Sequence, residues 1–259
     1  MSTYVYGIAA SSHPALPDGM DGVGKPPLPV RTLKEGELAA IVGDAPEDLR
    51  PKRNNLLAHQ NVLNEAGAGG PVLPMRFGSV APDDAAIRGV LAERAEHYHE
   101  RLKTLAGKAE YNVKASHDEA AALHRVMSEN PEIRTLTEAN RQAGGGSHEQ
   151  RLRLGEMVVA AFQSLENEDA VELRHTLEPV AEAISVGPGS TGWLANMSFL
   201  VDRTSPAAFL DAVDAVRKSH PHLELRVHGP LPPYSFVEPG PSQPTDTRAG
   251  SVGSQTGGG

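Results

Sequence analysis

Histidine is the side chain here with the widest chemical range, because it titrates near neutral pH and ligates metals. The sequence has 11 histidines and no cysteine. His97 and His99 lie two positions apart on a predicted helix, so they point to different sides of it. His220 and His222 flank a proline in a predicted turn, and no acidic partner with evident geometry is nearby. We expect all four to be surface residues, and the pattern predicts no metal site.

His59 has a different setting. It shares a predicted helical stripe with Leu56 and Leu63, which places it at least partly inside the fold. We interpret it as a neutral core histidine that hydrogen-bonds within the protein, in preference to a functional group.

Arg76 lies in an otherwise apolar strand predicted over residues 73–77. A charge in such a run needs a carboxylate partner or an exposed edge. We expect a structural ion pair, with Glu110 on the next predicted strand as the candidate partner, and no catalytic role.

Other patterns that could carry catalysis are weak. The glycines of residues 22–25 and 187–192 do not form a phosphate-binding loop. No serine, histidine and aspartate set with a nucleophile elbow is present. The acidic stretch 166–169 is interpreted as the solvated start of a helix. These observations predict a protein that is not an enzyme and needs no cofactor.

Composition narrows the class further. Hydrophobic residues make up 39% and charged residues 22%, which suits a globular core. The formal net charge of −9 argues against nucleic acid or an anionic membrane as the partner. The lack of cysteine excludes disulfides and thiol nucleophiles. No apolar run is long enough to span a membrane and no signal peptide is recognised, so we expect a soluble, cytoplasmic protein.

The first half alternates strands and helices. Strands are predicted over residues 4–10, 38–42, 71–78 and 110–115, with helices over 54–66 and from 82 to about 105. The prolines in 71–78 favour an edge strand. The order ββαβαβ predicts a modified ferredoxin-like α+β domain over residues 1–116.

The second half begins with helices and ends in a βαβ unit, which predicts a second α+β domain over residues 117–238. Asn130 and Pro131 suit the N-cap and first position of a helix. Separate helices are predicted over 150–165 and 170–184, followed by strand 193–201, helix 206–219 and strand 223–228. Residues 239–259 are rich in proline, glycine and serine, and are predicted to be a disordered tail.

Residues 229–237, here termed the closing segment, are rich in proline and aromatic residues. We expect a stiff extended strap. Alternation would place Tyr234 and Phe236 on one face, packed against the protein's own core. A proline-rich linker or a ligand for a polyproline-binding domain is the alternative, but aromatics form only 4% of the chain, which favours burial. The key positions are Gly229, Pro230, Pro232, Pro233, Tyr234 and Phe236.

Four stretches, in order, resemble the gas vesicle protein family GvpL/GvpF. They are residues 4–8, residue His59 with segment 72–78, residues 195–201, and residues 229–236. The second stretch contains Pro74, Arg76, Phe77 and Gly78 of a Leu-Pro-Met-Arg-Phe-Gly sequence. In the last stretch, Leu231 stands where the family usually has tryptophan. The match spans residues 4–237.

The resemblance implies a two-domain α+β accessory protein of gas vesicle formation with a ferredoxin-like N-terminal domain. It implies association with gas vesicles and contact with the small apolar shell protein and with other gas vesicle accessory proteins. The alternative is an enzyme or small-ligand-binding protein on ferredoxin-like domains, because that fold hosts many functions. A deep cleft with convergent polar groups would favour the alternative, and a broad apolar or edge-strand surface would favour the assembly factor.

Overall fold

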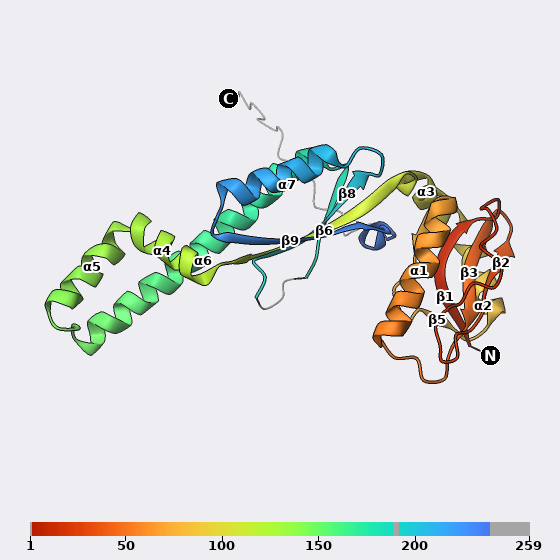
Figure 1. The fold of residues 1–259 in the computed structure, drawn as a ribbon, viewed down its shortest axis with the longest axis horizontal. Helices are drawn as coiled ribbons and strands as arrows, with labels where there is room; N and C mark the ends of the chain where they lie inside the picture. The colour runs from red at the N-terminus through yellow and green to blue at the C-terminus, as the bar shows by residue number, and fades with distance from the viewer. Residues whose placement is uncertain (1, 189–191, 239–259) are drawn as a thin grey trace, which may run out of the picture.

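The fold is elongated and contains two antiparallel sheets. A computed structural model describes residues 2–188 and 192–238. The first sheet and its helices lie at one end of the molecule, the second sheet lies in the middle, and a helical arm extends from the other end (Figure 1). This confirms the mixed α+β class. The predicted tail, residues 239–259, lies outside the described residues. Within the described parts, no helix combines the length and apolarity needed to span a bilayer.

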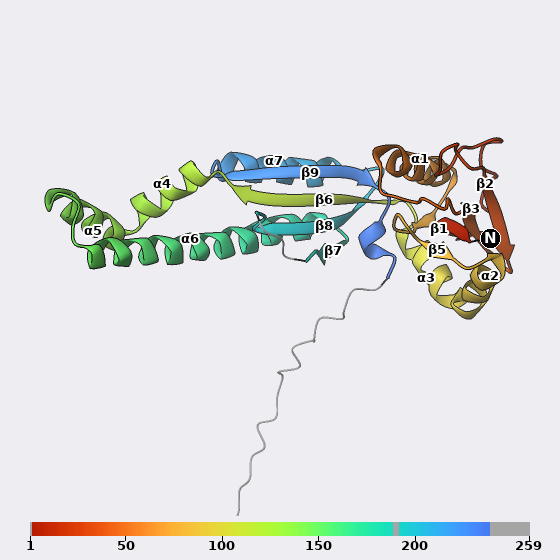
Figure 2. The same cartoon turned by 90° about the horizontal axis from the view of Figure 1, so that it is seen from below.

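The first sheet has the strand order β2-β3-β1-β4, and β5 also pairs with β1. Helix α1 packs on one face, where its buried residues meet Tyr4 and Tyr6 of β1. Helices α2 and α3 cover the other face, as Figure 2 shows. The bounds are β1 Thr3–Ala10, β2 Val30–Glu35, β3 Leu38–Asp44, α1 Arg53–Gly69, β4 Val72–Pro74, β5 Val80–Ala81, α2 Asp84–Glu93 and α3 Ala95–Leu105.

The second sheet has the order β7-β8-β6-β9, with α6 and α7 packed on one of its faces. The element order β6-α6-β7-β8-α7-β9 is the βαββαβ order of a ferredoxin-like fold. The bounds are β6 Lys108–His117, α4 Glu119–Glu129, α5 Pro131–Gln142, α6 His148–Leu177, a 3-10 turn Glu178–Val180, β7 Ala183–Val186, β8 Ala195–Asp202, α7 Ala207–Ser219, β9 Leu223–Leu231 and a second 3-10 turn Tyr234–Phe236.

The predicted order ββαβαβ for the first half is wrong at its last strand. That strand, β6, pairs with β8 and β9 of the second sheet and with no strand of the first. The ferredoxin-like topology therefore belongs to the second half of the chain. The division at residue 116 stays a prediction, and the pairing of β6 leads us to propose a division near residue 107 in its place.

The arm, defined as α4, α5 and the part of α6 before residue 166, is an insertion between β6 and the rest of the second sheet. Asn130 caps α5 with Pro131 in the first turn, as predicted. The helices predicted over 150–165 and 170–184 are wrong, because α6 is one helix of 30 residues. Its buried positions Leu165, Asp169, Leu173 and Leu177 recur every four residues and keep one face against the second sheet and the arm.

Candidate functional site

His59 is the centre of a buried hydrogen-bonded chain between α1 and the first sheet. The Met75 carbonyl accepts from Nε2 of His59 at 3.1 Å, which fixes the proton on that nitrogen. Nδ1 then accepts from the Tyr4 hydroxyl at 2.8 Å. The Tyr4 oxygen in turn accepts from the Gly78 amide at 3.3 Å. The ring also stacks on Tyr6 with 5.6 Å between centroids. His59 therefore ties α1 to β1 and to the loop that follows β4.

Burial sets the protonation of this group. His59 is only 4% exposed, and desolvation lowers its pKa from the usual value, while the hydrogen bond to Met75 opposes that shift. Burial likewise raises the pKa of Tyr4. A neutral core histidine is thus the state that the geometry supports. Leu63 is buried beside it, but the prediction for Leu56 is wrong, because 42% of Leu56 is exposed.

The loop after β4 contains the other predicted motif residues. Pro74 is buried at the end of β4, and Phe77 makes edge contacts with Tyr4 and His59. Gly78 has φ +91°, a backbone conformation that favours glycine. Arg76 is exposed and forms no ion pair with Glu110, so the predicted partner is wrong. β4 pairs only with β1 among the described strands, as expected for an edge strand.

The closing segment leaves β9 through a bulge. The register of β6 with β9 shifts at Tyr111, opposite Gly229 and Pro230. A Cβ on Gly229 would lie 2.6 Å from the Tyr111 ring and 2.9 Å from the Glu110 carbonyl, so only glycine fits there. Residues Tyr234–Phe236 then form a 3-10 turn, and the predicted extended alternation is therefore wrong.

Phe236 is buried as predicted despite the different backbone, and Tyr234 is partly buried. Phe236 is buried in the core cluster of α2, α3 and the first sheet, which Leu200 of the second sheet also joins. Tyr234 packs on the opposite cluster, beside Tyr4 and Tyr6. Because the turn is helical, the two rings enter different cores. The closing segment therefore joins both faces of the first sheet to the second sheet.

Glu110 is the polar anchor of this joint. Its carboxylate is buried on β6 and accepts from the Ser235 amide and hydroxyl, each at 2.8 Å. The Arg101 guanidinium of α3 donates to the Phe236 carbonyl at 2.8 Å. Burial, with the nearby charge of Glu110, raises the pKa of Tyr234 to about 12. Hydrogen bonds to a charged group contribute about 1.5–3 kcal/mol each, so the joint is strongly held.

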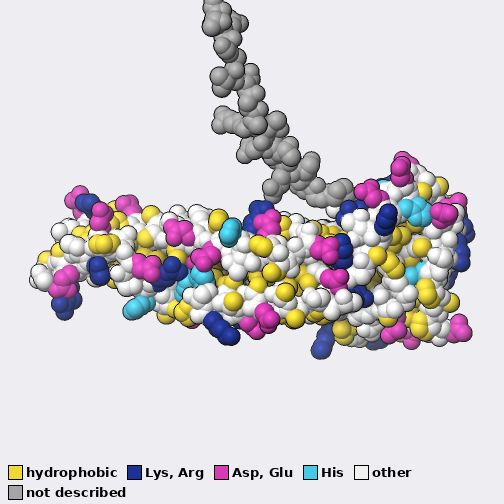
Figure 3. All heavy atoms as spheres, turned by 90° about the horizontal axis from the view of Figure 1, so that it is seen from above, with side chains coloured by type: hydrophobic (Ala, Val, Ile, Leu, Met, Phe, Trp, Pro, Cys, Tyr) yellow, Lys and Arg dark blue, Asp and Glu magenta, His cyan; other side chains and the backbone are white. Residues whose placement is uncertain are grey.

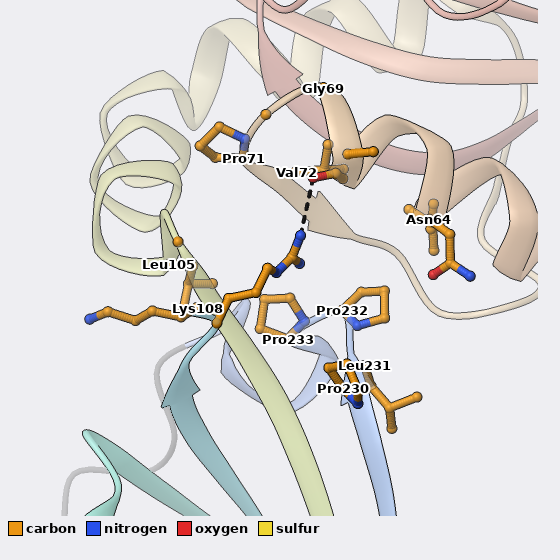
Figure 4. A pocket seen from close by; sticks show the side chains of 16 residues that line it. Asn64, Gly69, Pro71, Val72, Leu105, Lys108, Pro230, Leu231, Pro232 and Pro233 are labelled. Atoms are coloured by element: carbon orange, nitrogen blue, oxygen red, sulfur yellow. Dashed lines mark hydrogen bonds between the residues drawn. The ribbon is translucent and has the colours of Figure 1, made fainter. Parts of the chain in front are cut away.

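A cleft of about 530 Å³ lies between the two sheets at this joint. Figure 4 shows α1 and β4 on one side and prolines 230, 232 and 233 on the other. Across this cleft, the Arg203 guanidinium donates to the Gly67 carbonyl at 3.2 Å. Lys108 pairs with Glu182. The lining holds no carboxylate, imidazole or hydroxyl side chain. Lys108 is the one lining residue of a type that can transfer a proton or act as a nucleophile, and its amine is engaged in the ion pair with Glu182.

Sequence reasoning missed a second polar cluster, at the base of the arm. Oδ2 of Asp169 lies 2.7 Å from Nε2 of His117 and 2.8 Å from Nε2 of His222, and all three side chains are buried. Arg125 on α4 reaches His222 Nε2 at 2.9 Å. Our expectations that His222 is a surface residue and that 166–169 starts a helix are both wrong. His220 also has an acidic partner, Glu172, at 3.1 Å.

The three donor atoms lie within 4.8 Å of one another, which is close enough for a shared metal ion. Zinc ligands about 2.0–2.1 Å from a tetrahedral ion are about 3.3 Å apart, however. The 2.7 Å separation of His117 Nε2 from Asp169 fits an N–H to carboxylate hydrogen bond. Nε2 of His222 either donates to Asp169 at 2.8 Å or accepts from Arg125 at 2.9 Å, since one ring nitrogen cannot do both. Arg125 supplies a positive charge, with 3.6 Å between its Nη1 and Oδ1 of Asp169. The cluster fits a hydrogen-bonded ion pair that fixes the base of the arm to the second sheet.

Comparison with known proteins gives consistent matches over the described chain. The family model described as gas vesicle synthesis protein GvpL/GvpF matches residues 2–238. The chain is 62% identical to gas vesicle protein F of Streptomyces sp. (strain CB03234), over 92% of this chain and 100% of that protein. It is 26% identical to gas vesicle protein L1 of Halobacterium salinarum, over 81% of each.

Solved structures share the fold. The crystal structure of gas vesicle protein GvpF from Anabaena sp. PCC7120 superposes with a TM-score of 0.72 at 22% identity, over 92% of this chain and 99% of that one. The GvpF structure from Microcystis aeruginosa gives a TM-score of 0.69 at 21% identity, with the same coverage. At this level of identity, the likeness extends to the fold.

Proposed function

Because this chain belongs to the gas vesicle synthesis protein GvpL/GvpF family, we propose that it is a non-enzymatic accessory factor that binds the small apolar shell protein of gas vesicles. The family gives the gas vesicle role, and the partner and the mode of action are our inference. A small apolar shell protein must be kept from aggregating before it assembles, and a soluble acidic protein is suited to hold it. Other gas vesicle accessory proteins are further candidate partners.

The lining of the cleft between the sheets is the observation that most supports a binding role. It is formed by glycine, proline and aliphatic side chains, and its cations are engaged with protein groups. The convergent polar groups of the chain, His117, Asp169 and His222, are buried at the base of the arm and hydrogen-bonded to one another. These features support the accessory factor over the alternative of an enzyme or small-ligand-binding protein.

Helix α1 carries the apolar surface that we propose as the docking site. Leu56 and Leu57 are adjacent on it, and 42% and 45% of these side chains are exposed. The opposite side of α1 is fully used by the core, including His59. Adjacent exposed leucines on a rigid helix suit contact with an apolar partner. The exposed leucines of α1 thus support a shell-protein site in the N-terminal part of the chain.

The test is co-expression with the shell protein followed by pull-down. A Leu56→Gln/Leu57→Gln variant should lose the shell protein while its circular dichroism and melting temperature stay unchanged. The matched control is Leu152→Gln/Val159→Gln on the arm, where Leu152 is 56% exposed and Val159 is 57% exposed. This control should bind the shell protein like the parent. Loss in the control alone would move the site to the arm. No capture of shell protein by the parent would refute the proposal.

A further inference from the structure

In the part of the chain that the structure describes, helices cover only one side of the second sheet. Figure 2 looks onto the other side, termed the open face, with α6 and α7 behind the strands. Tyr111, Val113, Met197 and Phe199 point toward the helices and form the core there. Alternation along the strands puts their neighbours on the open face. The outward residues of β6, β8 and β9 are Asn112, Lys114, Asn196, Ser198, Arg226 and His228.

Two cations lie side by side on this face. Lys114 of β6 and Arg226 of β9 are cross-strand partners, a position where like charges destabilise a sheet. Within residues 2–188 and 192–238, neither forms an ion pair, although the sequence contains 33 acidic and 24 basic residues. Glu224, on the same face of β9, pairs in register with Ser116 instead. Among the described residues, no acidic side chain therefore offsets the repulsion between these two cations.

Trp193 lies over both cations. Its ring centroid is 5.5 Å from Nζ of Lys114 and 5.0 Å from Cζ of Arg226, which is within cation–π range. It is the single tryptophan of the chain and is only partly buried. An aromatic ring beside two unpaired cations combines an apolar platform with positive charge. The opposite, helix-covered side has acidic and basic side chains interspersed (Figure 3).

The neighbouring amides are arranged for hydrogen bonding. Nδ2 of Asn112 donates to Oδ1 of Asn196 and to Oγ of Ser198, each at 3.1 Å. Asn196 uses its oxygen in this network, and its amide Nδ2, which lies beside Gly187, is a further hydrogen-bond donor. A backbone carbonyl is an acceptor of the right kind. The open face therefore has two cations, an aromatic ring and an amide donor close together on neighbouring strands.

We propose that this open face binds an acidic, extended segment of a partner protein. Alternate side chains of an extended peptide point to the same side and repeat every ~6.6 Å, which lets two carboxylates reach Lys114 and Arg226 together. Single-stranded RNA fits less well, because sheet-based RNA readers stack bases on strand aromatics and these outward strand positions have none. The proposal goes beyond the shell-protein site on α1 and does not depend on it.

Binding is measured with a fluorescein-labelled peptide that has glutamate at alternate positions with threonine between, and with a control peptide in which glutamine replaces glutamate. Anisotropy gives the affinity, and the emission of Trp193 reports contact directly because no other tryptophan is present. Lys114→Gln/Arg226→Gln removes two positive charges from the open face. Lys103→Gln/Lys218→Gln removes two exposed charges elsewhere and is the matched control.

The acidic peptide should bind and change the Trp193 emission, and the glutamine peptide should not. The open-face variant should weaken binding by about tenfold or more, since charge-assisted contacts are lost, while the control variant binds like the parent. Binding should weaken as salt rises. The absence of peptide binding, or equal binding by both variants, would overturn the proposal. Binding of an oligouridine in place of the peptide would assign the face to nucleic acid instead.

Discussion

Truncation of Phe236 tests whether the closing segment holds the fold together. Phe236 is 7% exposed and belongs to the cluster that includes Leu91 and Leu102 of the first half and Leu200 of the second sheet. Phe236→Ala removes the ring from this shared core and leaves a void, which costs about 3–5 kcal/mol. A domain of 150–250 residues loses about 2–4 °C of melting temperature per kcal/mol, so the expected fall is about 6–20 °C.

The assay is thermal unfolding followed by circular dichroism, with Phe236→Leu as the control that keeps an apolar side chain in the core and should therefore cost less than Phe236→Ala. Pull-down of the shell protein by Phe236→Ala should fail only where the protein is unfolded. A variant that melts like the parent, keeps its circular dichroism and still loses the shell protein would refute this reasoning. That result would make the closing segment a partner-binding site.

Four further predictions concern the remaining elements. His59→Ala should lower the free energy of unfolding by about 1–3 kcal/mol in urea titrations, because Tyr4 and Met75 lose their buried partner. The pKa of His59 is lower in the folded state than in the unfolded state, so below pH 6.5 the unfolded chain binds more protons than the folded one. The free energy of unfolding of the parent should therefore decrease as the pH falls below 6.5, and that of His59→Gln should decrease less. Asp169→Ala should cost about 3–5 kcal/mol in urea titrations, whereas exposed Glu168→Ala should stay within about 0.5 kcal/mol. Truncation after Glu238 should leave the melting temperature nearly unchanged, because residues 239–259 lack apolar periodicity, and a fall of many degrees would contradict this.

Local sequence patterns predicted the helices and strands themselves better than they predicted which strands pair with one another. The apolar stripe of residues 87–105 located the buried faces of α2 and α3, and Asn130-Pro131 located a helix start. The sheet to which β6 belongs was beyond such signals, because its partner β8 is more than 80 residues away along the chain. The division of α6 into two helices had a similar cause. The acidic stretch that suggested a helix start includes Asp169, whose burial depends on histidines from other elements.

The candidate site was predicted in composition but not in geometry. His59 and Phe236 were correctly expected inside the fold, because an imidazole on an apolar stripe and scarce aromatics both favour burial. The side-chain alternation that predicted an extended closing segment could not reveal the 3-10 turn, which sends Tyr234 and Phe236 into different cores. The sequence suggested Arg76 as the partner of Glu110 because their charges are opposite. In the structure, Glu110 instead accepts hydrogen bonds from Ser235, which is distant along the chain.

The position of the closing segment in the chain has a consequence for biosynthesis. Residues 234–238 leave the ribosome after every other described residue, yet Phe236 and Val237 complete the core beside α2 and α3. The N-terminal half therefore cannot complete its core until residues 234–238 have been made, even though domains generally fold from the N-terminus during synthesis. A chain cut short before Tyr234 would present that core to proteases and chaperones. The final packing of the first core thus depends on the most C-terminal part of the described chain.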